Sequence, residues 1–175
     1  MHHDIAGRAA DLAVSVHTAP RRVLDVGCGP GYLLRLLAGR YPQADELAGI
    51  DAAPAMIDAA GQAGDDRRLQ FTVGVAERLP YPDDTFDLIV STTSFDHWAD
   101  QQAGLGECAR VLAPGGHLVL ADQFSPLLLP TLLAGRRGKA RTQRRASQLL
   151  SAAGFRDVSW HDLYALIIKA VTATI

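Results

Sequence analysis

The sequence has little of what marks several specialised classes of protein. Its only cysteines, Cys28 and Cys108, lie far apart and fit neither a CxxC metal motif nor a redox motif. No apolar run approaches the roughly 18 residues that a membrane span needs. The net charge of -2 gives no general reason to expect nucleic acid or an anionic membrane as partner. We therefore expect no disulfide scaffold, no metal site and no membrane span, and a reducing cytoplasm as the location.

What is present is typical of one globular domain. The chain of 175 residues is 48% hydrophobic and 21% charged, which argues against disorder. A chain of this length buries roughly 70% of its unfolded surface. The opening residues, MHHDIAGRAADLAV, have no basic segment leading into an apolar core, so a secretory signal is not expected. We expect a single domain over residues 1–175.

Short apolar strands alternate with helical patterns through the first 122 residues. The strands are expected at 22–27, 47–51, 69–76, 87–92 and 117–122. The helices are expected from Asp4 as a cap to about residue 16, from Pro30 to about residue 40, from Pro54 to Ala60, and from Ala103 to Leu112. This alternation predicts right-handed crossovers and a doubly wound, mainly parallel sheet.

The last third of the chain follows a different pattern. A helix is expected from Thr142 to Ala153, followed by two alternating segments that predict a C-terminal antiparallel hairpin. Before it, residues 124–134 are apolar but contain two prolines, and residues 136–145 hold six of the 17 basic residues. The basic run is expected to be a solvated face. With its apolar neighbour it could also form a lid, a homodimer contact or a site for an apolar or anionic substrate.

A glycine turn, VLDVGCGPG, follows the first strand. Gly27, Gly29 and Gly31 let the backbone turn tightly and approach a ligand, and the next helix points its N-terminal amides there. In doubly wound sheets this edge binds ligands. The dinucleotide pattern G-x-G-x-x-G fails because its sixth position is Tyr32, and the Gly-Lys-Ser/Thr ending of a phosphate-binding loop is absent.

Two acidic residues narrow the class of ligand that the glycine turn could bind. Asp25 precedes the glycines, where a carboxylate would repel a pyrophosphate and attract a cation. Asp51 ends the second strand, where its carboxylate can accept hydrogen bonds from both hydroxyls of a ribose. Dehydrogenases place an acid similarly, so Asp51 alone does not separate the two classes. Asp25 favours a positively charged adenosine cofactor.

Four segments of the sequence together resemble the motifs of a known family. They are DVGCGPG, GIDAAPAMI, GVAERLPYPDDTFDLIVS and RVLAPGGHLVLAD. In order and spacing over about residues 20 to 122, the chain resembles the class I S-adenosylmethionine (SAM)-dependent methyltransferases of the small-molecule, type 11-like kind. The resemblance implies a Rossmann-like seven-stranded sheet with a terminal hairpin, and SAM as cofactor. The cofactor contacts that it implies are Asp25, Gly27, Cys28, Gly29, Gly31, Asp51, Ala52, Met56, Ala76, Glu77 and Ser91.

Within this set the glycines would wrap the methionine part, Asp25 would face its ammonium and Met56 would pack near the adenine. One position departs from the family pattern. Many relatives have an aspartate before the Ala-Glu pair to accept from the adenine amino group, and this chain has Val75. Glu77 is the candidate for replacing that interaction.

His97, in SFDHWAD after the fourth strand, is the candidate catalytic residue. It would act as a general base or position the substrate, because an imidazole titrates near neutral pH. A polar contact that holds its short helix is an equal alternative. Both alternatives stay open.

The function predicted from the sequence is methyl transfer from SAM to a small or medium-sized acceptor, most simply at oxygen. A non-catalytic SAM-binding protein is one alternative. A nicotinamide-dependent oxidoreductase is another, disfavoured by Tyr32 and Asp25. Base methylation of nucleic acid is disfavoured because Ser91-Thr92-Thr93-Ser94 stands where such enzymes carry an Asn/Asp-Pro-Pro-aromatic run.

Overall fold

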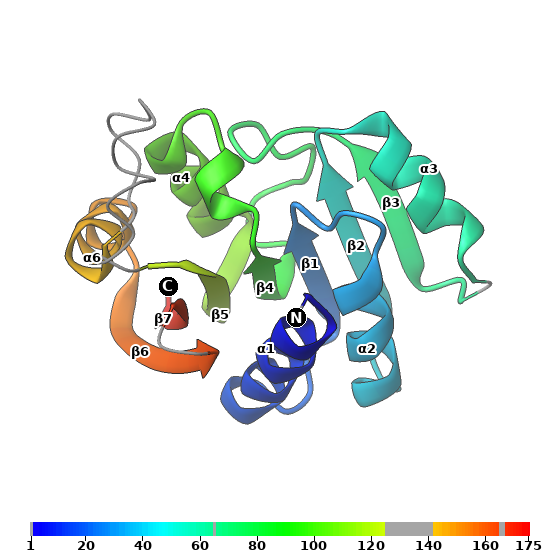
Figure 1. Ribbon diagram of the computed structural model, residues 1–175, viewed down its shortest axis with the longest axis horizontal. Coiled ribbons are helices and arrows are strands. Elements are labelled where there is room, and N and C mark those ends of the chain that lie inside the picture. The colour runs from blue at the N-terminus through cyan, green and yellow to red at the C-terminus, as the bar shows by residue number, and fades with distance from the viewer. Residues whose placement is uncertain (1, 65, 125–141, 165–166) are drawn as a thin grey trace.

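The computed structural model describes residues 2–64, 66–124, 142–164 and 167–175. Its strands form one seven-stranded sheet in the order β3-β2-β1-β4-β5-β7-β6 (Figure 1). They are β1 (Arg22–Val26), β2 (Glu46–Asp51), β3 (Leu69–Val73), β4 (Phe86–Thr92), β5 (Leu112–Gln123), β6 (Arg156–Tyr164) and β7 (Ile168–Thr174). The first five strands run parallel, and β7 pairs antiparallel with both β5 and β6. The predicted fold class and terminal hairpin are confirmed.

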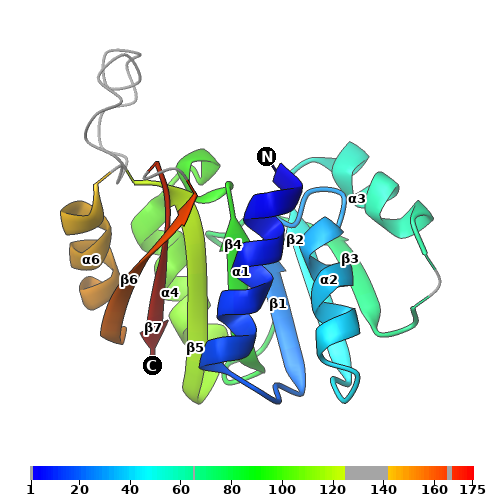
Figure 2. The ribbon, with the colours of Figure 1, turned by 60° about the horizontal axis from the view of Figure 1, so that its bottom comes forward.

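Helices cover both faces of the sheet. They are α1 (His2–Val16), α2 (Tyr32–Arg40), α3 (Pro54–Gln62), α4 (Gln101–Val111) and α6 (Gln143–Ala152), with a short 3-10 helix, η1 (Phe95–His97). Figure 2 shows α1 and α2 on one face and α4 and α6 on the other. Because strand residues alternate between faces, Val23 belongs to the apolar cluster that includes α1 and α2, whereas Leu24 belongs to the cluster that includes α4 and α6. Two apolar layers thus hold the central strands.

Several boundaries differ from the sequence expectations. The second helix begins at Tyr32, so Pro30 lies in the preceding turn, and α1 already includes Asp4 in its first turn. β3 ends at Val73, three residues before the expected end, and the Gly74 N–H makes the last bond of the ladder, to the Asp51 carbonyl oxygen at 3.0 Å. β5 begins at Leu112, five residues before the expected start, since Leu112 pairs with Phe86 of β4. These shifts leave the predicted order of elements unchanged.

Residues 125–134 of the apolar segment and residues 136–141 of the basic run lie outside the described residues. Phe124 is described and is buried, and Thr142 caps α6 by accepting a hydrogen bond from the Arg145 backbone N–H at 3.3 Å. None of the described helices has the length and apolar character to cross a membrane. The described residues contain no cluster of three or more His, Cys, Asp or Glu side chains suited to a metal ion.

Candidate functional site

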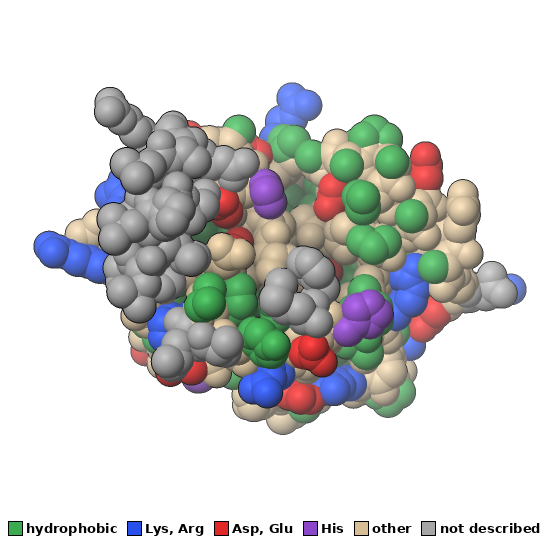
Figure 3. All heavy atoms as spheres, viewed as in Figure 1, with side chains coloured by type: hydrophobic (Ala, Val, Ile, Leu, Met, Phe, Trp, Pro, Cys, Tyr) green, Lys and Arg blue, Asp and Glu red, His purple; other side chains and the backbone are tan. Residues whose placement is uncertain are grey.

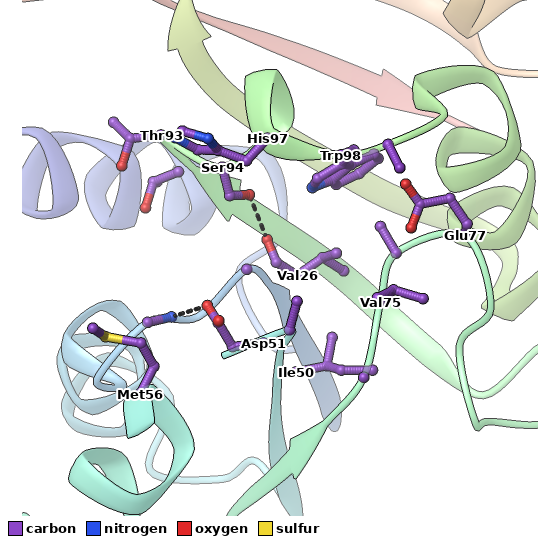
Figure 4. Close-up of a pocket in the computed structure, with 17 residues that line it drawn as sticks. Val26, Ile50, Asp51, Met56, Val75, Glu77, Thr93, Ser94, His97 and Trp98 are labelled. Atoms are coloured by element: carbon purple, nitrogen blue, oxygen red, sulfur yellow. Dashed lines mark hydrogen bonds between the residues drawn. The ribbon is translucent and has the colours of Figure 1, made fainter. Parts of the chain in front are cut away.

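A cavity of about 620 Å³ opens at the carboxyl ends of β1, β2, β3 and β4 (Figure 4). Such a volume lies in the range of small-molecule and cofactor sites. The cavity is lined by Val26, Gly27, Gly29, Ile50, Asp51, Ala52, Met56, Gly74, Val75, Ala76, Glu77, Thr92, Thr93, Ser94, His97, Trp98 and Ala99. This is the edge at which a doubly wound sheet binds its ligand, at the point where the strand order reverses between β1 and β4.

The glycine turn forms the floor of the cavity. Gly27, Gly29 and Gly31 all have positive φ angles, of 76°, 52° and 77°, in the region that side chains disfavour. A Cβ at Gly27 would lie 2.3 Å from both Cβ and Oγ of Ser94. The turn is also tied to β2, because the backbone N–H groups of Gly27 and Cys28 donate to the Ile50 carbonyl oxygen at 2.8 and 3.0 Å. All three positions therefore favour glycine for conformation, and Gly27 and Gly31 need it for space as well.

Replacing Gly27 by alanine should lower the free energy of unfolding by about 2 kcal/mol, through the strained φ angle and the clash with Ser94. Chemical denaturation of the variant checks this value. Gly39→Ala is the matched control, because Gly39 lies within α2 with open space around its Cβ position. That change should stabilise the fold by up to about 1 kcal/mol. Equal effects of the two changes would contradict the packing argument.

Asp51 is held in place by the backbone on both sides. Its Oδ2 accepts from the Gly29 N–H at 2.9 Å, and its Oδ1 accepts from the Ala53 N–H, also at 2.9 Å. Each carboxylate oxygen has a second lone pair. The carboxylate therefore joins the end of β2 to the glycine turn and keeps acceptor capacity toward the cavity that it lines.

Asp25 lies beneath the turn and is almost fully buried, with 1% of its surface exposed. No described residue donates a hydrogen bond to its Oδ1. Burial, with a smaller effect from the negative charge of Asp51, raises the pKa of Asp25 to about 8. A nearby cation would stabilise the charged form of this buried carboxyl group.

The end of β4 is tied to β1 by two serines. Ser91 Oγ and Ser94 Oγ both donate to the Val26 carbonyl oxygen, at 2.8 and 2.9 Å. The short helix η1 follows, and its His97 side chain is exposed and lines the cavity. Asp122 of β5 contributes to this arrangement, because its Oδ2 accepts from the backbone N–H of Asp96 at 3.1 Å. Burial raises the pKa of Asp122.

The structure brings most of the sequence-predicted residues to the cavity. Eight of them line it: Gly27, Gly29, Asp51, Ala52, Met56, Ala76, Glu77 and His97. Asp25 and Ser91 are buried behind the wall, where Ser91 joins strands. Cys28 is also buried, and burial raises the pKa of its thiol, which suits a packing role and not a nucleophile. Gly31 precedes α2, where a Cβ would meet the Phe71 ring at 2.6 Å.

Other lining residues were not singled out from the sequence. They are Val26, Ile50, Gly74, Thr92, Thr93, Ser94, Trp98 and Ala99. Most of them end a predicted strand or follow it directly, so the rule that ligands bind at the carboxyl ends could have found them. Asp122 also ends an expected strand, 117–122, but its contact with Asp96, which is 26 residues away, has no local signal in the sequence.

Comparison with known proteins assigns the chain to a family. A family model described as a methyltransferase domain matches residues 24–120. The chain is 43% identical over 125 residues to a demethylmenaquinone methyltransferase of Deinococcus radiodurans, which covers 70% of this chain and 51% of that protein. It is 36% identical over 133 residues to a malonyl-[acyl-carrier protein] O-methyltransferase of Halorhodospira halophila, covering 75% and 44%. The chain thus spans about half the length of these relatives.

Solved structures show the same architecture. A putative methyltransferase of Haloferax volcanii, solved in complex with the Trm112 methyltransferase activator, gives a TM-score of 0.83 at 22% identity and covers 95% of this chain and 88% of its own. Human N-acetylserotonin methyltransferase in complex with SAM gives 0.74 at 26% identity, covering 96% and 51%. The chain belongs to the class I SAM-dependent methyltransferases, in the methyltransferase-domain family.

The residues of the cavity fit the cofactor of this family. SAM carries a sulfonium and an ammonium group. The lining residues include the carboxylates of Asp51 and Glu77 but neither lysine nor arginine, and the buried acid Asp25 lies close by. A pyrophosphate would meet these negative charges with no basic side chain among the described lining residues to balance them. The predicted preference for a cationic nucleoside is therefore supported by the composition of the site.

Proposed function

We propose that the chain transfers the methyl group of SAM to a small-molecule acceptor, with oxygen as the acceptor atom. The observation that carries this proposal is the cavity at the carboxyl ends of β1, β2 and β4, which combines a glycine turn with acidic groups and has an imidazole at its mouth. Bound SAM would supply an electrophilic methyl group whose sulfur leaves without charge. The task left to the protein is mainly orientation, which can contribute roughly 7–11 kcal/mol of the barrier.

Each proposed role follows from the placement of a residue. Asp51 would accept from the ribose hydroxyls, because its carboxylate lines the cavity with orientation already fixed by two backbone N–H groups. Asp25 would compensate the ammonium group from behind the glycine turn. Figure 4 shows His97 on the β4 side of the cavity, across from Met56. There His97 would take the proton of an acceptor hydroxyl, and its exposure would let that proton pass to water.

The acceptor is proposed at the level of class. The two relatives above are named for a quinone and for a carrier-bound malonyl group, and the second is an O-methyltransferase. As a first panel we would use a short-chain demethylnaphthohydroquinone, a catechol and a malonyl thioester. Release of S-adenosylhomocysteine with any of them supports catalysis. Binding of SAM without transfer to any acceptor in a broader panel would favour the non-catalytic alternative.

His97→Ala should lower kcat for a hydroxyl acceptor by about 100-fold, within the range of general acid–base catalysis, and leave the Kd of SAM within about threefold. Initial rates and calorimetry measure the two quantities. Gln102→Ala is a suitable control, because Gln102 lies on the neighbouring α4 and is not a lining residue. An unchanged kcat in His97→Ala would leave His97 with a structural role only.

Two further proposals concern the setting of the protein. Cys28 and Cys108 are both free and buried, which suits a reducing compartment, and we place the protein in the cytoplasm. A homodimer remains a proposal that rests on the apolar residues 124–134 of the sequence. Sedimentation of the purified chain would test the dimer.

A further inference from the structure

The cavity has a polar half and an apolar half. The ends of β1 and β4 with η1 supply hydroxyl and imidazole groups on one side. On the other side, between β2, α3 and the segment after β3, the lining residues are mainly apolar: Ile50, Ala52, Met56, Gly74, Val75 and Ala76, beside the acids Asp51 and Glu77. Figure 3 shows that hydrophobic side chains gather over α3 on the same face of the molecule. The apolar half suits the flat purine ring of a nucleoside.

The polar groups that border the apolar half already have partners. Glu77 Oε1 accepts from the backbone N–H of Asp100, directly before α4, at 2.9 Å. The Val75 carbonyl oxygen accepts from the Arg78 N–H at 3.3 Å. This hydrogen bond fixes the Glu77 side chain to Asp100, the N-cap of α4, and so restrains it from turning toward a bound purine. Among the lining residues of the segment after β3, Gly74 to Glu77, Glu77 is the only one whose side chain has an acceptor oxygen.

Val75 lies at the rim of this half, where 44% of its surface is exposed. Figure 4 shows it on the same segment as Glu77, facing the cavity beside Ile50. A rim position leaves room for a group attached to the edge of the purine to extend into water. A branched apolar side chain there can neither accept a hydrogen bond from a 6-amino group nor repel an alkyl group that replaces its hydrogens.

We propose that this half of the cavity holds the purine without a side chain that accepts a hydrogen bond from its 6-amino group, and that Val75 is the residue that sets this specificity. The site then accepts cofactors and cofactor analogues that are alkylated at the 6-amino nitrogen. This inference rests on the proposed function, because it takes SAM and its product as the ligands of the cavity. It adds that the 6-amino group contributes little to their recognition.

Calorimetry with S-adenosylhomocysteine and its N6,N6-dimethyl analogue tests the inference without a methyl acceptor. The wild-type chain should bind the two with Kd values within about threefold of each other. Val75→Asp should bind S-adenosylhomocysteine at least about tenfold more tightly than the dimethyl analogue, because the new carboxylate can accept from the amino group only when it carries hydrogens.

Val73→Asp is the matched control. Val73 is exposed to a similar degree, 49%, and lies in β3 two residues away, but it does not line the cavity. The same added charge there should leave the ratio of the two Kd values unchanged. Glu77→Ala separates the competing assignment, because it removes the acceptor oxygen of that side chain. Weaker binding of S-adenosylhomocysteine, with binding of the dimethyl analogue unchanged, would show that Glu77 contacts the amino group and would overturn the inference. A wild-type preference of tenfold or more for S-adenosylhomocysteine would overturn it too. Failure of both ligands to bind would overturn the proposed function itself.

Discussion

Asp51→Ala should weaken the binding of S-adenosylhomocysteine at least about 100-fold. The carboxylate is proposed to accept from two ribose hydroxyls, and hydrogen bonds to charged groups contribute about 1.5–3 kcal/mol each. The change also removes the acceptor of the Gly29 and Ala53 N–H groups, so the glycine turn loses its tie to the end of β2. Calorimetry gives the Kd. Asp58→Ala is the control, because Asp58 is an exposed acid on α3 outside the cavity.

A second ligand separates the ribose contact from the effect on the turn. The 2′-deoxy analogue of S-adenosylhomocysteine should bind the wild-type chain about tenfold or more weakly than the parent compound. On Asp51→Ala the two compounds should bind alike, since the acceptor of the 2′-hydroxyl is gone. If the deoxy analogue loses the same factor on both proteins, Asp51 does not contact the ribose.

Asp25→Asn should stabilise the unliganded fold at pH 7 by about 3–4 kcal/mol. The pKa of Asp25 is raised from 3.8 to about 8 in the fold, so the folded chain binds more protons than the unfolded chain between these values. The contribution of Asp25 to the free energy of unfolding is therefore fully present below about pH 4. It is lost as the pH rises through about 8, at about 1.4 kcal/mol per pH unit. Asparagine has no such dependence.

Denaturation at pH 4, 5.5 and 7 measures the difference between the two proteins, which should shrink toward pH 4. Ligand binding should move in the opposite direction, because a cationic cofactor favours ionised Asp25. SAM should therefore bind Asp25→Asn about tenfold more weakly, and its binding to the wild-type chain near pH 7 should release protons that calorimetry in two buffers detects. A pH-independent difference in stability would contradict the buried, proton-binding carboxyl.

Much of this fold can be predicted from local pattern. Buried parallel strands such as 22–26 and 87–92 are short, mainly apolar runs bounded by turn residues, so their positions are evident in the sequence. The start of β5 is not evident. Pro114, Gly115 and Gly116 suggest a helix end, yet Leu112 pairs with Phe86, and Gly116 accepts from the Ile175 N–H at 3.3 Å. Pairing partners distant in sequence override the local signal there.

The residues of the site likewise divide into those that local sequence predicts and those that depend on partners distant in sequence. The glycines, Asp51 and Met56 belong to short motifs, and their chain neighbours place them at the sheet edge. Thr93 does not: it has a φ of 52°, unusual for a threonine, and its N–H donates to the Ala121 carbonyl oxygen at 2.8 Å. That bond crosses from β4 to β5, and sequence spacing carries no trace of it. The polar wall around His97 depends on such contacts.

The identity of the ligand is the central claim, and direct binding tests it most simply. Calorimetry of the purified chain with SAM, S-adenosylhomocysteine and NAD should show one site per chain for each sulfur nucleoside and no heat of binding for NAD. This preference for the sulfur nucleosides over NAD is predicted because the described lining residues of the cavity include acidic side chains but no basic one. Binding of NAD with neither sulfur nucleoside bound would contradict the account.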